Sequence, residues 1–149
     1  MTDPATDPIA EPLADRLAVG DVIVRYAACI DDRDFDAYRS CFTRDVQLHG
    51  FGADPIRGVD AWLAFVAKAL EGFDATQHLL GPSAVTVSGD TATLRADVQA
   101  QHFFAEPRGR ILTLWGTYRS ELARSAGAWH IERHQLDTRA TRVSDAYRS

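Results

Sequence analysis

The hydrophobic period changes about halfway along the chain. Up to about residue 78, apolar residues recur at spacings of three and four, the period of an amphipathic helix, and beyond it they alternate with polar residues, as in a half-buried strand. The first pattern predicts three helices, over residues 12–31, 34–42 and 59–70. A short strand is expected at residues 46–51, between the second and third helices.

The second half of the chain is predicted to be strands and turns. Alternating segments cover residues 84–87, 91–104, 111–122 and 129–136, with turn sequences at residues 88–90 and 125–127. Helices followed by a meander predict an α+β fold, a cone-shaped barrel in which three N-terminal helices pack in a curved antiparallel sheet. One domain is expected over residues 12–137. Residues 1–11 would be a flexible lead-in, and residues 138–149 a tail or an oligomer contact.

Charge and composition exclude several classes of protein. The net charge is −5 and the arginines are scattered among acids, which argues against nucleic acid as a partner. The acidic, proline-rich first residues do not resemble a signal peptide, and no apolar run approaches the ~20 residues that cross a bilayer. The two cysteines fall in helical patterns and are expected to be reduced. A cytoplasmic protein that binds neither nucleic acid nor membrane is the expectation.

The segment 91–104 has one small, apolar face. Polar residues alternate there with five apolar ones, Ala92, Leu94, Ala96, Val98 and Ala100. Small side chains on a core-facing strand leave room either for a closely packed helix or for a cavity. The same register puts His102 on this face, where an unpaired imidazole would cost roughly 1–3 kcal/mol. His102 therefore needs a polar partner or a ligand.

Two further polar residues continue apolar patterns. Asp31 follows the apolar face of the first helix one turn beyond Ala27, and His78 is flanked by leucines just before a predicted strand. Asp31 alone could be a cap or a solvated helix end, and His78 alone could be a hydrogen-bonded core histidine. Histidine is also the side chain best suited to proton transfer near neutral pH.

A resemblance to a known family rests on six segments of the sequence. They lie at residues 26–36, 41–46, 76–78, 88–92, 116–118 and 127–133. In this order they resemble SnoaL-like domains of the nuclear transport factor 2-like superfamily, over about residues 13–135. The resemblance implies the cone-shaped fold and a homodimer or homotrimer. It is less specific for function, because this fold carries many chemistries and some members catalyse nothing.

Within this superfamily, three enzyme types resemble the chain around the polar residues. Scytalone dehydratase is similar around Asp31, His78 and His102, although Ile30 and Gly50 stand where that enzyme has tyrosines. Bile-acid dehydratase is similar in having a tyrosine five residues before the aspartate, as Tyr26 stands here. Hexachlorocyclohexane dehydrochlorinase shares the Asp and His, and the resemblance implies that Arg124 corresponds to its arginine.

The sequence therefore predicts a cofactor-independent lyase, a dehydratase or a related β-elimination enzyme acting on a hydrophobic hydroxy-carbonyl compound. His78 would be the base, Asp31 would orient it, and Tyr26 and His102 would assist the leaving group or polarise a carbonyl. The expected substrate-binding residues are Ile30, His49, Val98, Ala100 and Arg124. No metal site is expected, because no close-spaced ligand motif occurs. Three alternatives remain. The protein could be an isomerase or cyclase, a non-catalytic protein that binds a small ligand, or a subunit like the small subunit of ring-hydroxylating dioxygenases.

Overall fold

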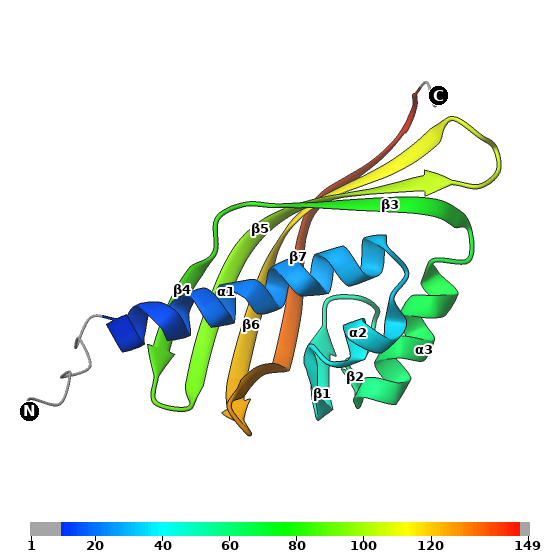
Figure 1. Cartoon of the computed structure of the whole chain (residues 1–149). Coiled ribbons are helices and arrows are strands. Elements are labelled where there is room, and N and C mark those ends of the chain that lie inside the picture. The colour runs from blue at the N-terminus through cyan, green and yellow to red at the C-terminus, as the bar shows by residue number, and fades with distance from the viewer. Residues whose placement is uncertain (1–9, 147–149) are drawn as a thin grey trace, which may run out of the picture.

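The computed structural model describes residues 10–146, which form three helices and one seven-stranded sheet (Figure 1). The elements in chain order are α1 (Ala10–Asp31), α2 (Phe35–Arg39), β1 (Phe42–His49), β2 (Ile56–Arg57), α3 (Val59–Ala69), β3 (Phe73–Leu80), β4 (Ala84–Ser88), β5 (Thr91–Phe104), β6 (Arg110–Ser125) and β7 (Ala128–Asp145). None of the helices in this described part is long and apolar enough to cross a membrane.

The sheet is mixed rather than wholly antiparallel. Its strand order is β2-β1-β7-β6-β5-β3, and β4 also pairs with β5. Every pair is antiparallel except β1 and β7, which run parallel. The expected α+β cone is confirmed, but the expectation of a purely antiparallel sheet was wrong at this pair. The chain reaches β7 from β1 only after α3 and five more strands, so β7 can arrive beside β1 in the same direction.

The sheet bends over the helices at Gly116 on β6. The register with β7 shifts between Trp115 and Gly116, as at a β-bulge. A Cβ atom at Gly116 would lie 2.9 Å from the backbone oxygen of Asp137 and 2.9 Å from a methyl carbon of Leu136. Only glycine permits this close approach of the two strands. The bend lets the sheet wrap around α1, which crosses its concave face in Figure 1.

α1 ends in a turn centred on a strained arginine. Arg33 has a φ of +58°, in the left-handed region that glycine usually occupies after a helix. Its guanidinium folds back and donates a hydrogen bond of 2.6 Å to the Ile30 carbonyl oxygen, which satisfies one of the last helical acceptors. Asp34 then caps α2 by accepting a hydrogen bond of 3.0 Å from the Ala37 backbone. This turn brings the end of α1 beneath β3.

Several element boundaries differ from the expectations. β3 was not predicted as a strand, and His78 lies within it rather than before a strand. β1 begins at Phe42, so the second helix is shorter than predicted. Residues 138–145, expected in the tail, continue β7 and pair with β6. Residues 1–9 of the expected lead-in lie outside the described residues, whereas residues 10 and 11 begin α1.

Candidate active site

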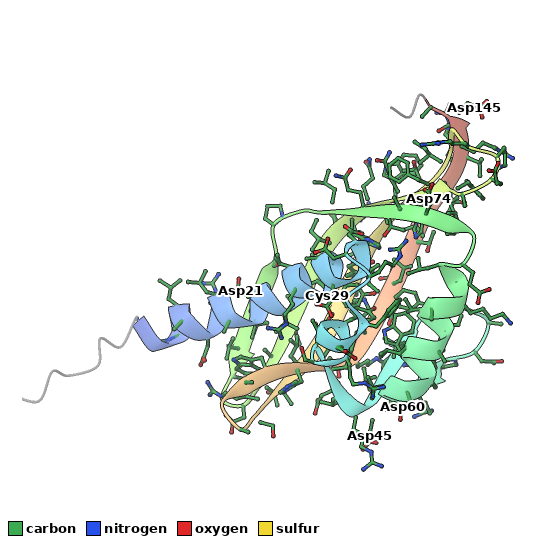
Figure 2. All side chains as sticks on the ribbon, turned by 45° about the vertical axis from the view of Figure 1, so that its right-hand side comes forward. Asp21, Cys29, Asp45, Asp60, Asp74 and Asp145 are labelled. Carbon is green, nitrogen blue, oxygen red and sulfur yellow. The ribbon has the colours of Figure 1, made fainter. Side chains whose placement is uncertain are left out.

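A cavity of about 140 Å³ lies between the helices and the concave face of the sheet. Figure 2 shows the side chains that fill the surrounding space between α1, α3 and the strands. Fifteen residues line the cavity, and most are apolar or aromatic: Tyr26, Ile30, Tyr38, Phe51, Trp62, Phe65, Val66, Ala69, Leu70, His78, Ala100, His102, Leu114, Tyr118 and Leu136. An apolar pocket with a few convergent polar groups is the usual form of a small-molecule site.

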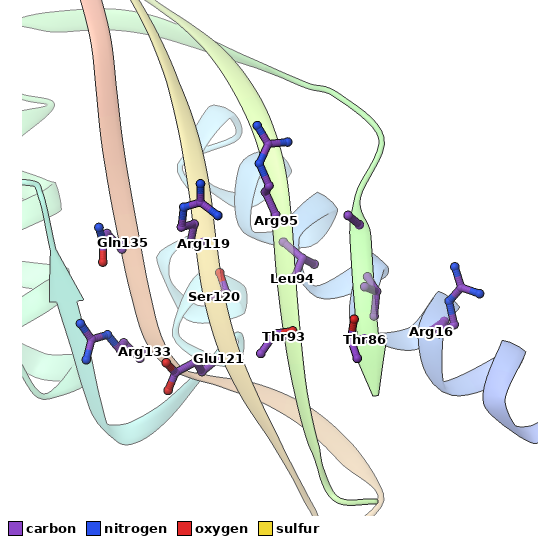
Figure 3. A pocket seen from close by; sticks show the side chains of 12 residues that line it. Arg16, Thr86, Thr93, Leu94, Arg95, Arg119, Ser120, Glu121, Arg133 and Gln135 are labelled. Atoms are coloured by element: carbon purple, nitrogen blue, oxygen red, sulfur yellow. The ribbon is translucent and has the colours of Figure 1, made fainter. Parts of the chain in front are cut away.

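A larger, open hollow of about 720 Å³ lies elsewhere on the molecule. Figure 3 shows side chains of Arg95, Arg119, Glu121 and Arg133 around it. None of the residues predicted to act on a substrate lines this hollow. The smaller cavity, not the larger hollow, therefore holds the candidate chemistry.

Asp31 and His78 meet at the wall of the cavity. His78 Nδ1 lies 2.7 Å from Asp31 Oδ1, and the His78 backbone N–H donates to Asp31 Oδ2 at 2.8 Å. A carboxylate only accepts hydrogen bonds, so Nδ1 carries the proton and Nε2 is the free lone pair. The exposed fraction of the His78 side chain is 8%, and that of Asp31 is 22%. This is the arrangement of an oriented base.

Thr76 and Arg33 extend this pair into a short network. The Thr76 hydroxyl donates to Asp31 Oδ1 at 3.0 Å, and Arg33 Nη1 donates to Thr76 Oγ1 at 2.8 Å. Burial raises the pKa of Asp31, but the hydrogen bonds from His78 and Thr76 outweigh it and hold that pKa below its usual value. Asp31 therefore stays ionised beside His78. Sequence reasoning assigned no role to Arg33 or Thr76.

His102 also lines the cavity, with its ring centroid 5.9 Å from that of His78. Burial and the neighbouring His78 lower the pKa of His102 to about 4, against the effect of a hydrogen bond to the Leu112 backbone. At neutral pH the ring is uncharged. In this state His102 is a hydrogen-bonding group rather than an imidazolium acid. Its Nδ1 is buried and has no hydrogen-bond partner among the described residues.

Three tyrosine side chains meet on the cavity wall. The ring centroid of Tyr26 lies 5.1 Å from that of Tyr38 and 5.5 Å from that of Tyr118, and the indole N–H of Trp62 donates to Tyr38 Oη at 3.0 Å. Burial raises the pKa of all three phenols well above the usual value, so each keeps its proton. Each phenol is therefore a potential hydrogen-bond donor. Tyr26 was predicted as part of the site. Tyr38 and Tyr118 were not.

The structure does not bring every predicted binding residue to the cavity. Ile30 and Ala100 line it, but Val98, His49 and Arg124 do not. Val98 lies on the same face of β5 as Ala100 and is packed into the core. His49 follows the buried Leu48 on β1, so strand alternation turns it to the other face.

Arg124 has a structural place far from the cavity. It bonds to Asp15 on α1 at 2.6 Å and to Asp90 in the β4–β5 turn at 2.9 Å. Its guanidinium also lies 4.9 Å from the ring centroid of Trp129. Arg124 thus ties the start of α1 to the sheet. Arg124 was predicted to bind substrate, but it does not line the cavity.

Within residues 10–146 no cluster of three His, Cys, Asp or Glu side chains forms a metal site. His49 is on another face from His78 and His102, so these three histidines do not converge. The polar groups that do converge are suited to proton transfer and hydrogen bonding.

The architecture is that of the nuclear transport factor 2-like superfamily. A hexachlorocyclohexane dehydrochlorinase, LinA type 2, has a TM-score of 0.84 and 18% identity, and the match covers 95% of this chain and 97% of that one. A candidate scytalone dehydratase from Novosphingobium aromaticivorans has a TM-score of 0.82 and 21% identity, covering 95% and 93%. At these identities the likeness is one of fold.

Residues 11–135 match the model of the SnoaL-like domain, and the chain belongs to that family. A candidate aromatic ring hydroxylase from Novosphingobium aromaticivorans is 30% identical, with a TM-score of 0.81, and the match covers 89% of this chain and 95% of that one. The solved structures that resemble this chain thus have names from more than one class of activity. The family resemblance read from the sequence is confirmed.

Proposed function

We propose that this protein is a cofactor-independent lyase that removes water, or a related leaving group, from a small hydroxy-carbonyl compound. The observation that carries the proposal is the 2.7 Å contact between His78 Nδ1 and Asp31 Oδ1 at the wall of an apolar cavity. A histidine oriented by an ionised carboxylate is a suitable general base at neutral pH. The dehydratase and dehydrochlorinase among the similar folds support an elimination.

The reaction follows from the placement of the groups. His78 Nε2 takes the proton from the carbon next to the carbonyl, and Asp31 stabilises the resulting imidazolium. The electron pair of that C–H bond forms a C=C bond, and the bond between the next carbon and its hydroxyl oxygen breaks. The imidazolium returns its proton to the departing oxygen, which leaves as water. A tyrosine O–H on the cavity wall would donate to the carbonyl oxygen as negative charge develops on it.

The cavity volume narrows the class of substrate. An apolar protein cavity of about 150 Å³ holds one benzene-sized molecule. The cavity here is about 140 Å³. A single six-membered ring therefore fits without rearrangement, whereas a steroid skeleton does not. We expect a monocyclic β-hydroxy ketone to be a better substrate than a polycyclic one.

The test uses 3-hydroxycyclohexanone as a probe and follows the enone by its ultraviolet absorbance. We expect the wild type to form cyclohexenone, and His78→Ala and Asp31→Asn each to lower kcat/KM by about 10²–10⁴. His49→Ala is the matched control, because that side chain faces away from the cavity. A wild type no faster than the two site variants would contradict the proposal.

An aromatic-ligand binding protein is the second candidate. The aromatic cavity wall favours it, because such a wall can bind an aromatic ring without any catalytic group taking part. An isomerase would use the same base without a leaving group, and would exchange the α-proton of cyclohexanone with deuterium from the solvent. Binding of the probe without dehydration or exchange would identify a binding protein.

A further inference from the structure

We infer that Arg33 and His102 form a subsite that binds one hydroxyl group beside the cavity that His102 lines. Each side chain has one buried polar atom without a hydrogen-bond partner among the described residues, Arg33 Nη2 and His102 Nδ1. The first is a donor, and the second is an acceptor in the tautomer that carries the proton on Nε2. A hydroxyl group is the simplest ligand that satisfies both, because it accepts one hydrogen bond and donates another.

The position of Arg33 is fixed from two sides. Its Nη1 donates a hydrogen bond of 2.6 Å to the Ile30 carbonyl oxygen and one of 2.8 Å to Thr76 Oγ1. These two bonds hold the guanidinium under β3. Thr76 lies directly opposite His102 in the β3–β5 register, and directly opposite residues of an antiparallel pair point to the same face. Arg33 therefore reaches the neighbourhood of the His102 ring. The backbone of Arg33 itself is strained, with a φ of +58°, and the surrounding contacts maintain this conformation.

The proposed contact uses one tautomer of His102. The ring lies beside the Leu112 backbone, which favours its protonated form but does not outweigh burial. Nδ1 has no hydrogen-bond partner among the described residues, and it presents a lone pair in the tautomer that carries the proton on Nε2. Nearby Arg33 and His78 also lower the pKa of His102, which keeps that lone pair free at neutral pH.

The subsite gives the hydroxyl a role that rests on the proposed function. The hydroxyl that leaves in a dehydration acquires negative charge as its C–O bond breaks. A guanidinium donor lowers the free energy of that charge, and His102 orients the group by accepting a hydrogen bond from its O–H. Arg33 then supplies the electrophile that a neutral His102 cannot supply.

Binding can be tested without knowing the substrate by using three single-ring probes. Phenol donates and accepts, anisole only accepts, and toluene does neither. We expect the wild type to bind phenol at least about tenfold more tightly than toluene in calorimetric titrations, with anisole between them. Arg33→Met should remove the preference of anisole over toluene, and His102→Phe should remove the preference of phenol over anisole. Toluene should bind both variants as it binds the wild type.

Arg119→Met on the outer face is the control and should keep all three affinities. Equal affinities of the wild type for phenol and toluene would overturn the subsite, and so would an unchanged order in both variants. Should a variant fold poorly, ring-proton chemical shifts of His102 in the wild type, titrated with phenol and with toluene, give the same answer. Loss of the subsite would leave the base at His78 untouched, because that proposal is tested by turnover of the hydroxy ketone.

Discussion

Two interior histidines, His134 and His102, are uncharged in the folded protein at neutral pH, and their burial makes the stability of the fold depend on pH. His134 is fully buried, stacks on Phe51 and bonds to Ser120 at 2.8 Å, and burial lowers its pKa to about 3. The pKa of His102 is lowered to about 4. In the unfolded chain both pKa values would return to about 6.5. The unfolded state therefore binds more protons than the folded state between about pH 4 and 6.5.

We expect the free energy of unfolding to fall as the pH drops below 6.5. From pH 7 to pH 5 each histidine should contribute a loss of about 2 kcal/mol, or about 4 kcal/mol for the two. Stability should change little between pH 7 and 8. Urea unfolding at each pH measures this free energy. His134→Gln should halve the change in the free energy of unfolding between pH 7 and 5, even if it lowers stability at every pH. A flat profile between pH 7 and 5 would show that the two rings are not buried uncharged.

The sequence predicted some site residues well and others not at all. Asp31 and His78 interrupt apolar patterns and match the family order, so they could be found. Arg33 could not, because a charged residue beyond a helix end is usually solvated, and its partner Thr76 is 43 residues away. The sequence could not show that Arg124 lies away from the cavity, because a position before the last strand does not indicate which end of that strand the cavity lies near.

At the scale of elements, Gly116 permits the close approach of β6 and β7. Gly116→Ala would force a Cβ atom against the Asp137 carbonyl and Leu136. We expect the free energy of unfolding to fall by about 1–3 kcal/mol, measured by urea titration, because the backbone and a packed side chain must both move.

Gly52→Ala is the matched control for the Gly116 variant. A Cβ atom at Gly52 would meet nothing within 4 Å, so the free energy of unfolding should change by less than about 0.5 kcal/mol. If the Gly116 variant is as stable as its control, the two strands have room to separate and the bend is not set by this contact.

Strands with a clear alternation were predicted well, and strands without one were missed. β5 was predicted at its observed bounds, because small apolar and polar residues alternate along it. β3 was not predicted, since Thr76 is buried while Leu79 is 66% exposed, the reverse of the usual polarity. The parallel pairing of β1 with β7 joins segments far apart in the chain, so no local sequence pattern predicts it.

For the whole molecule, the outer face of the sheet remains the predicted oligomer contact. Trp115 alternates with Leu114 and the other cavity-facing residues of β6, so it lies on the outer face, where it is partly exposed, whereas Thr113 and Thr117 on either side of it are buried. The Trp115 indole N–H donates to Gln99 at 3.1 Å, which holds the ring in place. A rigid aromatic side chain on a sheet face is a typical anchor for a two-fold contact.

We expect light scattering at micromolar concentration to give a dimer or trimer mass rather than the 16.4 kDa of one chain. Trp115→Arg should shift the mass toward the monomer without changing cavity binding, because the ring is on the opposite face. Arg133→Glu on another part of the outer surface serves as the comparison. A wild type that scatters as a single chain would refute the contact.

The cavity wall contains its own fluorescent reporter. Of the three tryptophans, Trp62 lines the cavity, stacks on Phe65 and donates its N–H to Tyr38. Trp115 faces outward and Trp129 is buried beneath Arg124. Indole emission responds to the polarity around the ring and to contact with a quencher. A Trp115→Phe, Trp129→Phe double variant would therefore emit from Trp62 alone, and any molecule entering the cavity could be detected by its effect on that emission, before a substrate is known.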